Sequence, residues 1–374
     1  MKVISEYSGL SKLPKLREIY SGKKILLVTG KKSYSLSGAQ EIIEKNLCKE
    51  KVIHFFEFSV NPKLEEAVIG ANYARQNGVT AIIAVGGGSV LDMAKLIKAF
   101  YCSHGNEVEL AKGILPVTDP RIPLIAIPTT AGSGSEATHF AVVYIGNDKY
   151  SLASDCLLAD ATILDGSLTT SGGKYLKTCN ALDAISQAIE SYWAAGSTKK
   201  SKQFAKTALI LGWNTVQRFV LDDSSNVDRQ TMMQVANLAG KAINISKTTA
   251  AHAWSYAFTS AIDVPHGHAV WLTLPAVFQA HLIANEGDVT DSRGINNHRK
   301  VIGELAGFLE LQNKVNVETS LNAFLETVGV EHKMENLGAG NIEIRSEISK
   351  KVNLERMKNN PVDLSSYTAQ IFRI

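Results

Sequence analysis

The sequence has little cysteine and no long apolar run. Its four cysteines, Cys48, Cys102, Cys156 and Cys179, are scattered without a CxxC pair, which argues against a disulfide framework and against a cysteine-bound zinc. No stretch is long enough to span a membrane, and the N-terminus lacks the apolar segment and cleavage site of a signal peptide. We therefore expect a cytoplasmic protein with reduced thiols and no membrane partner.

Strong charge, internal repeats and low-complexity segments are also missing. The net charge is +3 over 374 residues, and no basic tract is interleaved with aromatics, so nucleic acid is not an expected partner. The chain is 45% hydrophobic and 20% charged, as in ordinary globular proteins. Its length exceeds what one hydrophobic core usually supports and predicts two domains.

The first half alternates short apolar runs with amphipathic segments. This order predicts a parallel sheet that helices cover on both faces, because continuous apolar strands are typical of such sheets. We expect strands at residues 23–30, 52–58, 80–85 and 122–128, and helices at residues 37–49, 62–77 and 90–101.

From about residue 168 the sequence predicts mostly helices. The expected segments are residues 174–193, 200–220, 227–245 and 299–309, with helical periodicity throughout. Residues 165–173 are rich in Gly, Ser and Thr, which suits a linker. We therefore predict an α/β domain at residues 1–167 and a helical domain at residues 168–374.

Two loops at strand ends have the composition of a phosphate site. Gly86, Gly87, Gly88 and Ser89 precede a predicted helix, where backbone N–H groups and the helix dipole favour an anion, and Asp92 lies in position to orient the turn. The same glycines also suit an ordinary strand-to-helix turn.

A second loop makes the nucleotide interpretation stronger. It follows another predicted strand, and in parallel sheets ligands bind outside the carboxyl ends of the strands. A GxGxxG motif is absent, so an ordinary Rossmann dinucleotide domain is not expected. The loop adds four hydroxyls, from Thr129, Thr130, Ser133 and Ser135.

Histidines and polar helix residues in the second half predict a metal site. His252 and His266 are separated by a predicted helix that ends before Pro265, and Asp183, Gln187 and Glu190 share one helix face. Together they offer oxygen and nitrogen ligands acceptable to Fe(II), Zn(II) or Mn(II). The alternatives are a core histidine, a surface His-Gly-His turn and a solvated polar face.

In these motifs the chain resembles the iron-containing (group III) alcohol dehydrogenase family. The resemblance covers GGGSVLDMAK, PLIAIPTTAGSGSEAT, DKYSLAS, the Asp183 helix, the histidine pair with PHG, and NNPVDLS. It implies a dehydroquinate synthase-like architecture: an α/β dinucleotide-binding domain with a Rossmann-like sheet, followed by an all-α metal domain. It also implies a homodimer.

The resemblance carries ligand sets onto this sequence. Cofactor contacts to NAD(P) would be Asn61, Gly87, Gly88, Ser89, Asp92, Thr129, Thr130, Ser135 and Lys149, with Ser133 and Gly30 beside them. Metal ligands would be Asp183, Gln187, His252 and His266. This chain departs from the family in having Gln187 and Tyr256 where histidine is usual. An amide oxygen is a poorer transition-metal ligand than imidazole.

The implied chemistry is hydride transfer between the nicotinamide and a carbonyl carbon, with a metal, Fe(II) or Zn(II), as Lewis acid. Tyr256 either relays a proton, orders a water or only packs. At Gly30 the NAD users of the family carry an aspartate, whereas here Lys31 and Lys32 follow. This pattern predicts that NADPH is accepted, unless the lysines only solvate a loop.

Within the family the sequence looks most similar to phosphonoacetaldehyde reductases, which make 2-hydroxyethylphosphonate in phosphonate biosynthesis. Lys247 and His268 are the cations expected to hold a dianionic phosphonate, although Lys247 also suits a helix surface. The alternatives are a reductase of another aldehyde or sugar, a metal-dependent lyase like dehydroquinate synthase, and a non-catalytic nucleotide-binding relative.

Overall fold

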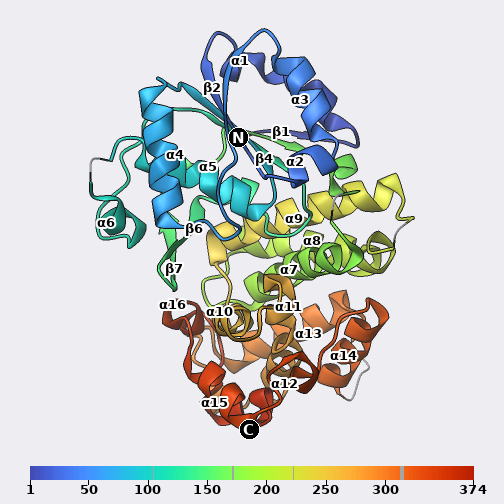
Figure 1. Ribbon diagram of the computed structural model, residues 1–374. Helices are drawn as coiled ribbons and strands as arrows, with labels where there is room; N and C mark the ends of the chain where they lie inside the picture. Colours follow the sequence, from blue (N-terminus) through green and yellow to red (C-terminus); the bar gives the residue numbers. More distant parts are fainter. Residues whose placement is uncertain (104, 171, 222, 312–315) are drawn as a thin grey trace. The chain divides into compact units, whose positions relative to one another are not determined.

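The computed structural model describes residues 1–103, 105–170, 172–221, 223–311 and 316–374. By compactness the chain divides into two units (Figure 1). The first comprises Met1–Gly172 and Arg229–Gly240, and the second comprises Gly173–Asp228 and Lys241–Ile374. The domain limits predicted from sequence, residues 1–167 and 168–374, stay a prediction.

The first unit contains a six-stranded parallel sheet. Its order is β1-β8-β5-β4-β2-β3, and every neighbouring pair is parallel. Four strands were expected from sequence, whereas β1 and β8 were not. The strands are β1 (Lys2–Ser5), β2 (Lys24–Thr29), β3 (Lys51–Phe55), β4 (Ala81–Gly86), β5 (Leu124–Pro128) and β8 (Ala161–Leu164).

Alternating side chains of β2 and β4 form two cores, one on each face of the sheet. Leu26 and Ile82 pack with α4 (Leu64–Gln76) and α5 (Gly88–Phe100). Ile25, Ile83 and their neighbours on the opposite face pack with the 3-10 helix Gly9–Leu16, α1 (Arg17–Tyr20) and α3 (Ala39–Leu47). The predicted sheet with two covered faces is confirmed, and Figure 1 shows α4 and α3 on opposite sides of it.

Two local features differ from the sequence prediction. The helix expected at residues 37–49 is α3, which begins only at Ala39 because Gly38 before it has a left-handed φ of 76°. A short helix that was not expected, α2 (Ser33–Leu36), precedes it. An antiparallel hairpin, β6 (Phe140–Ile145) and β7 (Asp148–Ala153), was not expected. It follows the second loop and packs with α5, and α6 (Glu107–Ala111) lies beside it.

The second unit is helical, and no strand is assigned to its described residues. Helix α9 (Asn226–Ser246) contributes its residues Arg229–Gly240 to the first unit. The other helices are α7 (Lys174–Trp193), α8 (Lys199–Phe219), α10 (Ala250–Ile262), α11 (His266–Trp271), α12 (Leu274–Ile283), α13 (Gly294–Phe308), α14 (Val317–Thr327), α15 (Ile342–Lys350), α16 (Leu354–Lys358) and α17 (Thr368–Phe372). The α/β and all-α fold classes predicted from sequence are confirmed.

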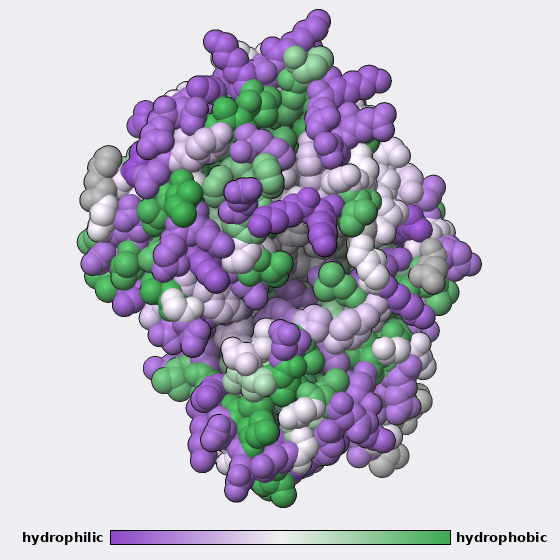
Figure 2. Space-filling model, in the orientation of Figure 1, coloured by the Kyte–Doolittle hydropathy of each residue, from purple (hydrophilic) through white to green (hydrophobic). Residues whose placement is uncertain are grey.

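Most of the face drawn in Figure 2 carries hydrophilic side chains, with apolar groups between them. Among the described residues, no helix combines the length and the apolar character that crossing a membrane requires.

Candidate functional site

Three polar side chains are buried along one stripe of α7. Asp183, Gln187 and Glu190 are 6%, 4% and 0% exposed, and their spacing of four and three residues places them on the same face of the helix. Buried polar groups require partners, because their desolvation otherwise costs free energy. The partners of this stripe therefore define the site.

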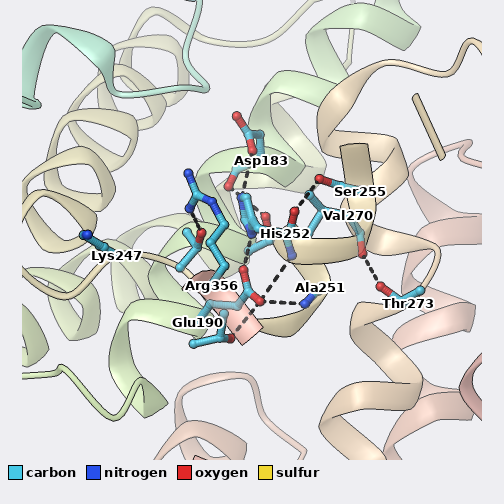
Figure 3. Close-up of polar contacts among 12 residues, drawn as sticks. Asp183, Glu190, Lys247, Ala251, His252, Ser255, Val270, Thr273 and Arg356 are labelled. Atoms are coloured by element: carbon cyan, nitrogen blue, oxygen red, sulfur yellow. Dashed lines mark hydrogen bonds and ion pairs between the residues drawn. The ribbon is translucent and has the colours of Figure 1, made fainter. Parts of the chain in front are cut away.

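Glu190 is fully enclosed by donors from the start of α10. One carboxylate oxygen accepts from Thr249 Oγ1 at 2.8 Å and from the backbone N–H of Ala251 at 2.9 Å. The other accepts from His252 Nδ1. Figure 3 shows the carboxylate between the α10 backbone and the His252 ring. Glu190 thus caps the N-terminus of α10 and orients the first predicted histidine ligand.

Both histidines turn Nε2 toward Asp183. The carboxylate of Glu190 only accepts, so His252 Nδ1 carries a proton, and His252 Nε2 faces Asp183 Oδ1, 3.4 Å away. His266 Nδ1 lies 3.4 Å from Ser255 Oγ, and its Nε2 lies 3.9 Å from the same Asp183 oxygen. When both Nε2 atoms are deprotonated, as metal binding requires, acceptor atoms face each other here, as they do around a cation.

The unsatisfied atoms of the site support the same interpretation. Asp183 Oδ1, Gln187 Oε1 and His252 Nε2 are buried and have no hydrogen-bond partner in the described part of the chain. The ligand atoms of Asp183, His252 and His266 all lie within 4.8 Å of one another. This donor set fits a divalent transition metal. The resulting ligand assignment is a proposal, and the sequence had predicted the same four residues.

Electrostatics keeps both carboxylates of the site ionised. Burial alone would raise the pKa of Asp183, but His252 and His266 outweigh it and hold this pKa below its usual value. Burial also opposes ionisation of Glu190, whose pKa is nevertheless lowered by the charge of His252. Metal ligands of this kind must be deprotonated, so the arrangement is ready to bind a cation.

The loop between α10 and α11 determines where His266 lies. Asp263 ends α10 with a left-handed φ of 51°, and Pro265 precedes His266, the first residue of α11. Gly267 then brings the α11 backbone directly against α7. As expected from the sequence, His252 lies on a helix and His266 follows a proline beyond the end of that helix.

Tyr256 lies beside the proposed ligands. Its ring stacks on the ring of His266, with centroids 5.6 Å apart and planes at 7°. The guanidinium of Arg356 lies over the Tyr256 ring, 5.7 Å from its centroid. Burial raises the pKa of Tyr256, and the charge of Arg356 only partly opposes this shift. The phenol is therefore protonated at neutral pH, and its predicted relay role stays a prediction.

The structure does not gather the two cations predicted to bind substrate around the metal ligands. The Lys247 ammonium is exposed and forms an ion pair with Glu355, and in Figure 3 it points away from His252. His268 is engaged at both ring nitrogens, with Tyr175 Oη at 2.6 Å and with the carbonyl of Glu331 at 2.6 Å. Burial lowers the pKa of His268, which disfavours the predicted cation and leaves a neutral imidazole.

The predicted cofactor residues gather at the carboxyl edge of the sheet in the first unit. Strands β4 and β5 are adjacent, and Gly86 aligns with Pro128, so the two loops begin side by side. A Cβ on Gly88 would lie 2.8 Å from Ser133 Oγ, and one on Gly87 would lie 3.4 Å from Thr130. The loops are therefore in contact, and Gly30 follows β2, the neighbour of β4.

Other predicted cofactor residues support these loops. The backbone N–H of Asn61 donates to Ser89 Oγ at 3.2 Å. Thr129 is buried, and its Oγ1 has no hydrogen-bond partner among the described residues, as expected for a group that awaits a ligand. Lys149 on β7 is close enough for its charge to act on Asp92.

A buried lysine that the sequence analysis did not single out connects the two loops. Lys95 is 0% exposed, and its ammonium donates to Ser135 Oγ and Thr138 Oγ1, both at 3.0 Å, and to the carbonyl of Phe140 at 2.9 Å. Ser135 Oγ in turn donates to Asp92 Oδ1 at 2.6 Å. Asp92 and Ser135 thus bind each other beneath the loops.

Sequence reasoning missed Arg356 and Asn359 at the site. Asn359 belongs to the NNP motif that was quoted only for its resemblance, and its amide donates to the carbonyls of Ser246 and Thr248. Arg356 precedes this motif and has no motif of its own.

Comparisons with known proteins agree with this arrangement. The family description "Iron-containing alcohol dehydrogenase" matches residues 1–166, and "Fe-containing alcohol dehydrogenase family, C-terminal" matches residues 178–371. Phosphonoacetaldehyde reductase of Streptomyces viridochromogenes is 31% identical over 232 residues, 60% of this chain and 59% of that protein. Probable alcohol dehydrogenase EutG of Escherichia coli is 31% identical over 58% of this chain and 55% of that protein. The chain thus aligns with less than two thirds of each of these relatives.

Solved structures share the fold over the whole chain. Sulfoacetaldehyde reductase from Bifidobacterium kashiwanohense, in complex with NAD+, has a TM-score of 0.88 at 23% identity and covers 100% of this chain and 96% of its own. The iron-containing alcohol dehydrogenase of Thermococcus thioreducens has a TM-score of 0.84 at 22% identity, with coverages of 100% and 98%. Because the two family descriptions follow each other along nearly the full sequence, the chain belongs to the iron-containing alcohol dehydrogenase family.

Proposed function

We propose that the protein is an NAD(P)H-dependent reductase that converts a small anionic aldehyde, with phosphonoacetaldehyde as the first candidate, to a primary alcohol. The proposal rests on three buried atoms that have no hydrogen-bond partner among the described residues: Asp183 Oδ1, Gln187 Oε1 and His252 Nε2. Such atoms are costly unless a ligand satisfies them. The relative from Streptomyces viridochromogenes supports the choice of aldehyde.

In this proposal Asp183, Gln187, His252 and His266 hold a divalent metal, Fe(II) or Zn(II). When bound, the metal supplies Lewis acidity toward a carbonyl oxygen and the nicotinamide supplies the hydride. Glu190 keeps the His252 ring in the required orientation and tautomer. The Tyr256 ring stacks on the ring of His266, and in this proposal its hydroxyl donates a hydrogen bond to the reacting oxygen or to a water.

The cofactor is proposed to bind at the two contacting loops of the first unit. The N-terminus of α5 begins at Gly88, so its backbone N–H groups and dipole favour the diphosphate. Gly30 has no carboxylate to repel a 2′-phosphate, and Lys31 and Lys32 are exposed beside it. These features favour NADPH over NADH.

The test is an NADPH oxidation assay on phosphonoacetaldehyde, combined with metal analysis of the purified protein. We expect saturable NADPH consumption and about one divalent metal per chain. If NADPH is consumed only with other aldehydes or with sugars, one of these replaces phosphonoacetaldehyde as the proposed substrate. A lyase would turn over with no net NADPH consumption, and a chain that binds nucleotide but no metal would be a non-catalytic relative. A homodimer, proposed from family membership, is checked by analytical ultracentrifugation.

A further inference from the structure

The side chain of Arg356 approaches the proposed metal centre from α16. Its guanidinium carbon lies 5.7 Å from the centre of the Tyr256 ring, and that ring stacks on the proposed ligand His266. In Figure 3 the guanidinium extends toward the side of the cluster where Asp183 and the His252 ring lie. The Arg356 cation therefore contacts the aromatic ring that stacks on a proposed metal ligand.

Arg356 lacks the acidic partner that four other arginines of this unit have. Arg218 pairs with Asp228, Arg293 with Asp291, and Arg345 and Arg373 with Glu335. Within the described ranges Arg356 forms no such ion pair. It donates to the neutral Thr248 Oγ1 and also hydrogen-bonds the neutral side chain of Tyr256. A half-buried guanidinium without a carboxylate is suited to an anion from outside the chain.

A strained turn fixes the position of this cation. Lys247 adopts φ 60° and ψ −177° at the end of α9, a backbone conformation that non-glycine residues adopt only when their surroundings impose it. Asn359 imposes it by donating to the carbonyls on both sides, Ser246 at 2.7 Å and Thr248 at 3.0 Å. The same turn presents Thr248 Oγ1 to Arg356.

Lys247 supports α16 in this arrangement. Its ammonium pairs with Glu355, the residue before Arg356. The pair is exposed, and exposed pairs contribute little to stability, but it links the strained turn to the start of the helix that carries Arg356.

We propose that Arg356 binds the tetrahedral oxyanion of the substrate, a phosphonate or sulfonate on the carbon next to the aldehyde. This inference rests on the proposed function and names the residue that gives it specificity. The planar guanidinium donates two parallel hydrogen bonds to such a group, and the anion of a two-carbon aldehyde lies near its carbonyl, as Arg356 lies near His266. Sequence reasoning had assigned this role to Lys247 and His268.

The kinetic test compares Arg356→Gln with the matched control Lys358→Gln, which removes an exposed cation from the same helix. Phosphonoacetaldehyde and sulfoacetaldehyde are compared with neutral propanal. For Arg356→Gln we expect KM for the preferred anionic aldehyde to rise about 10-fold or more, with KM for propanal and metal content unchanged. The KM of Arg356→Lys should lie between those of wild type and Arg356→Gln, because lysine keeps the charge but lacks the paired donors of the guanidinium. Parallel losses on charged and neutral aldehydes would overturn the proposal.

A binding test separates this inference from the proposed activity. Methylphosphonate and methanesulfonate are titrated calorimetrically into the metal-loaded wild type and each variant. We expect one anion to bind the wild type and Lys358→Gln alike, and Arg356→Gln about 10-fold more weakly or not at all. If the anion binds in an Arg356-dependent way but the protein reduces no aldehyde, the proposed anion site stands and the proposed reductase activity is rejected. Equal binding by wild type and Arg356→Gln would reject the proposed anion site, whatever the activity. Which of the two anions binds shows whether the substrate carries a phosphonate or a sulfonate.

Discussion

Gly267 and Cys179 are in direct backbone contact. A Cβ on Gly267 would lie 1.9 Å from the carbonyl oxygen of Cys179 and 3.0 Å from Cβ of Asp183. The glycine between the two histidines of the PHGH segment therefore sets the separation of α11 from α7. Through that separation it sets the distance from His266 to Asp183.

Gly267→Ala tests whether this contact holds the metal centre together. The added methyl group forces α11 away from α7, because its neighbour is backbone and cannot rotate aside. We expect a loss of about 2 kcal/mol of unfolding free energy and a metal affinity at least about 10-fold lower. Denaturant unfolding and chelator competition measure both. Gly303→Ala on α13, where a Cβ meets nothing within 4 Å, is the control, and wild-type metal affinity in Gly267→Ala would contradict the interpretation.

Gln187→His tests the weakest member of the proposed ligand set. Imidazole binds transition metals better than an amide oxygen does, and Gln187 Oε1 is buried with no hydrogen-bond partner among the described residues. We expect about 10-fold tighter Zn(II) binding in chelator competition. Asp183→Asn, measured in parallel, should lose most of the affinity. If Gln187→His leaves the affinity as it was, the Gln187 side chain is not a ligand.

Gly30→Asp tests the predicted choice of cofactor. A carboxylate at this position repels the 2′-phosphate and binds the ribose hydroxyl of NADH, so kcat/KM for NADPH should fall about 10-fold relative to that for NADH. A Cβ here would lie 2.3 Å from Ser33 Oγ, a side chain that can rotate. Gly30→Ala controls for this crowding. The prediction fails if alanine changes the ratio as much as aspartate does, or if the wild type strongly prefers NADH.

Lys95 predicts a pH dependence of stability. Burial lowers its pKa to about 8, with Asp92 and Glu136 opposing the shift. Between about pH 8 and the unfolded-state value of about 10.5 the unfolded chain binds the extra proton, so this residue's contribution to unfolding free energy rises with pH. We expect the unfolding free energy of wild type minus that of Lys95→Met to rise by about 3 kcal/mol over this window. Below pH 8 the difference should be constant.

The control for Lys95 is Lys98→Met, one turn further along α5. Lys98 is 4% exposed and lies 3.9 Å from Asp160. Subtracting the curves removes the tyrosines and cysteines that titrate in the same range in both proteins. A difference for Lys95→Met that stays flat across this window would show that Lys95 does not titrate there.

The sequence predicted those parts of the fold whose signal is local. The bounds of α7 agree with its prediction, because its periodicity is long and unbroken. Strands β1 and β8 have four residues each, too few for a pattern, and they are defined by pairing across 159 positions, as Lys2 with Ala161.

The same limit applies to the candidate site. Asp183, Gln187, His252 and His266 follow from spacing and from the resemblance. Arg356 could not be predicted, because its role depends on a turn 108 residues earlier, where Thr248 accepts its hydrogen bond. The surroundings of His268 could not be predicted for a similar reason, because its partners, Tyr175 and Glu331, are remote in sequence.

Because α11 packs against α7, the reactivity of the Cys179 thiol reports on local opening between these two helices. Burial raises the pKa of Cys179 to about 12, whereas Cys48 and Cys102 are exposed. An alkylating reagent in excess should therefore consume the exposed thiols at once and reach Cys179 only when the segment around His268 lifts from it. The rate of the slow phase of alkylation then measures local opening around the proposed metal ligands in the native protein.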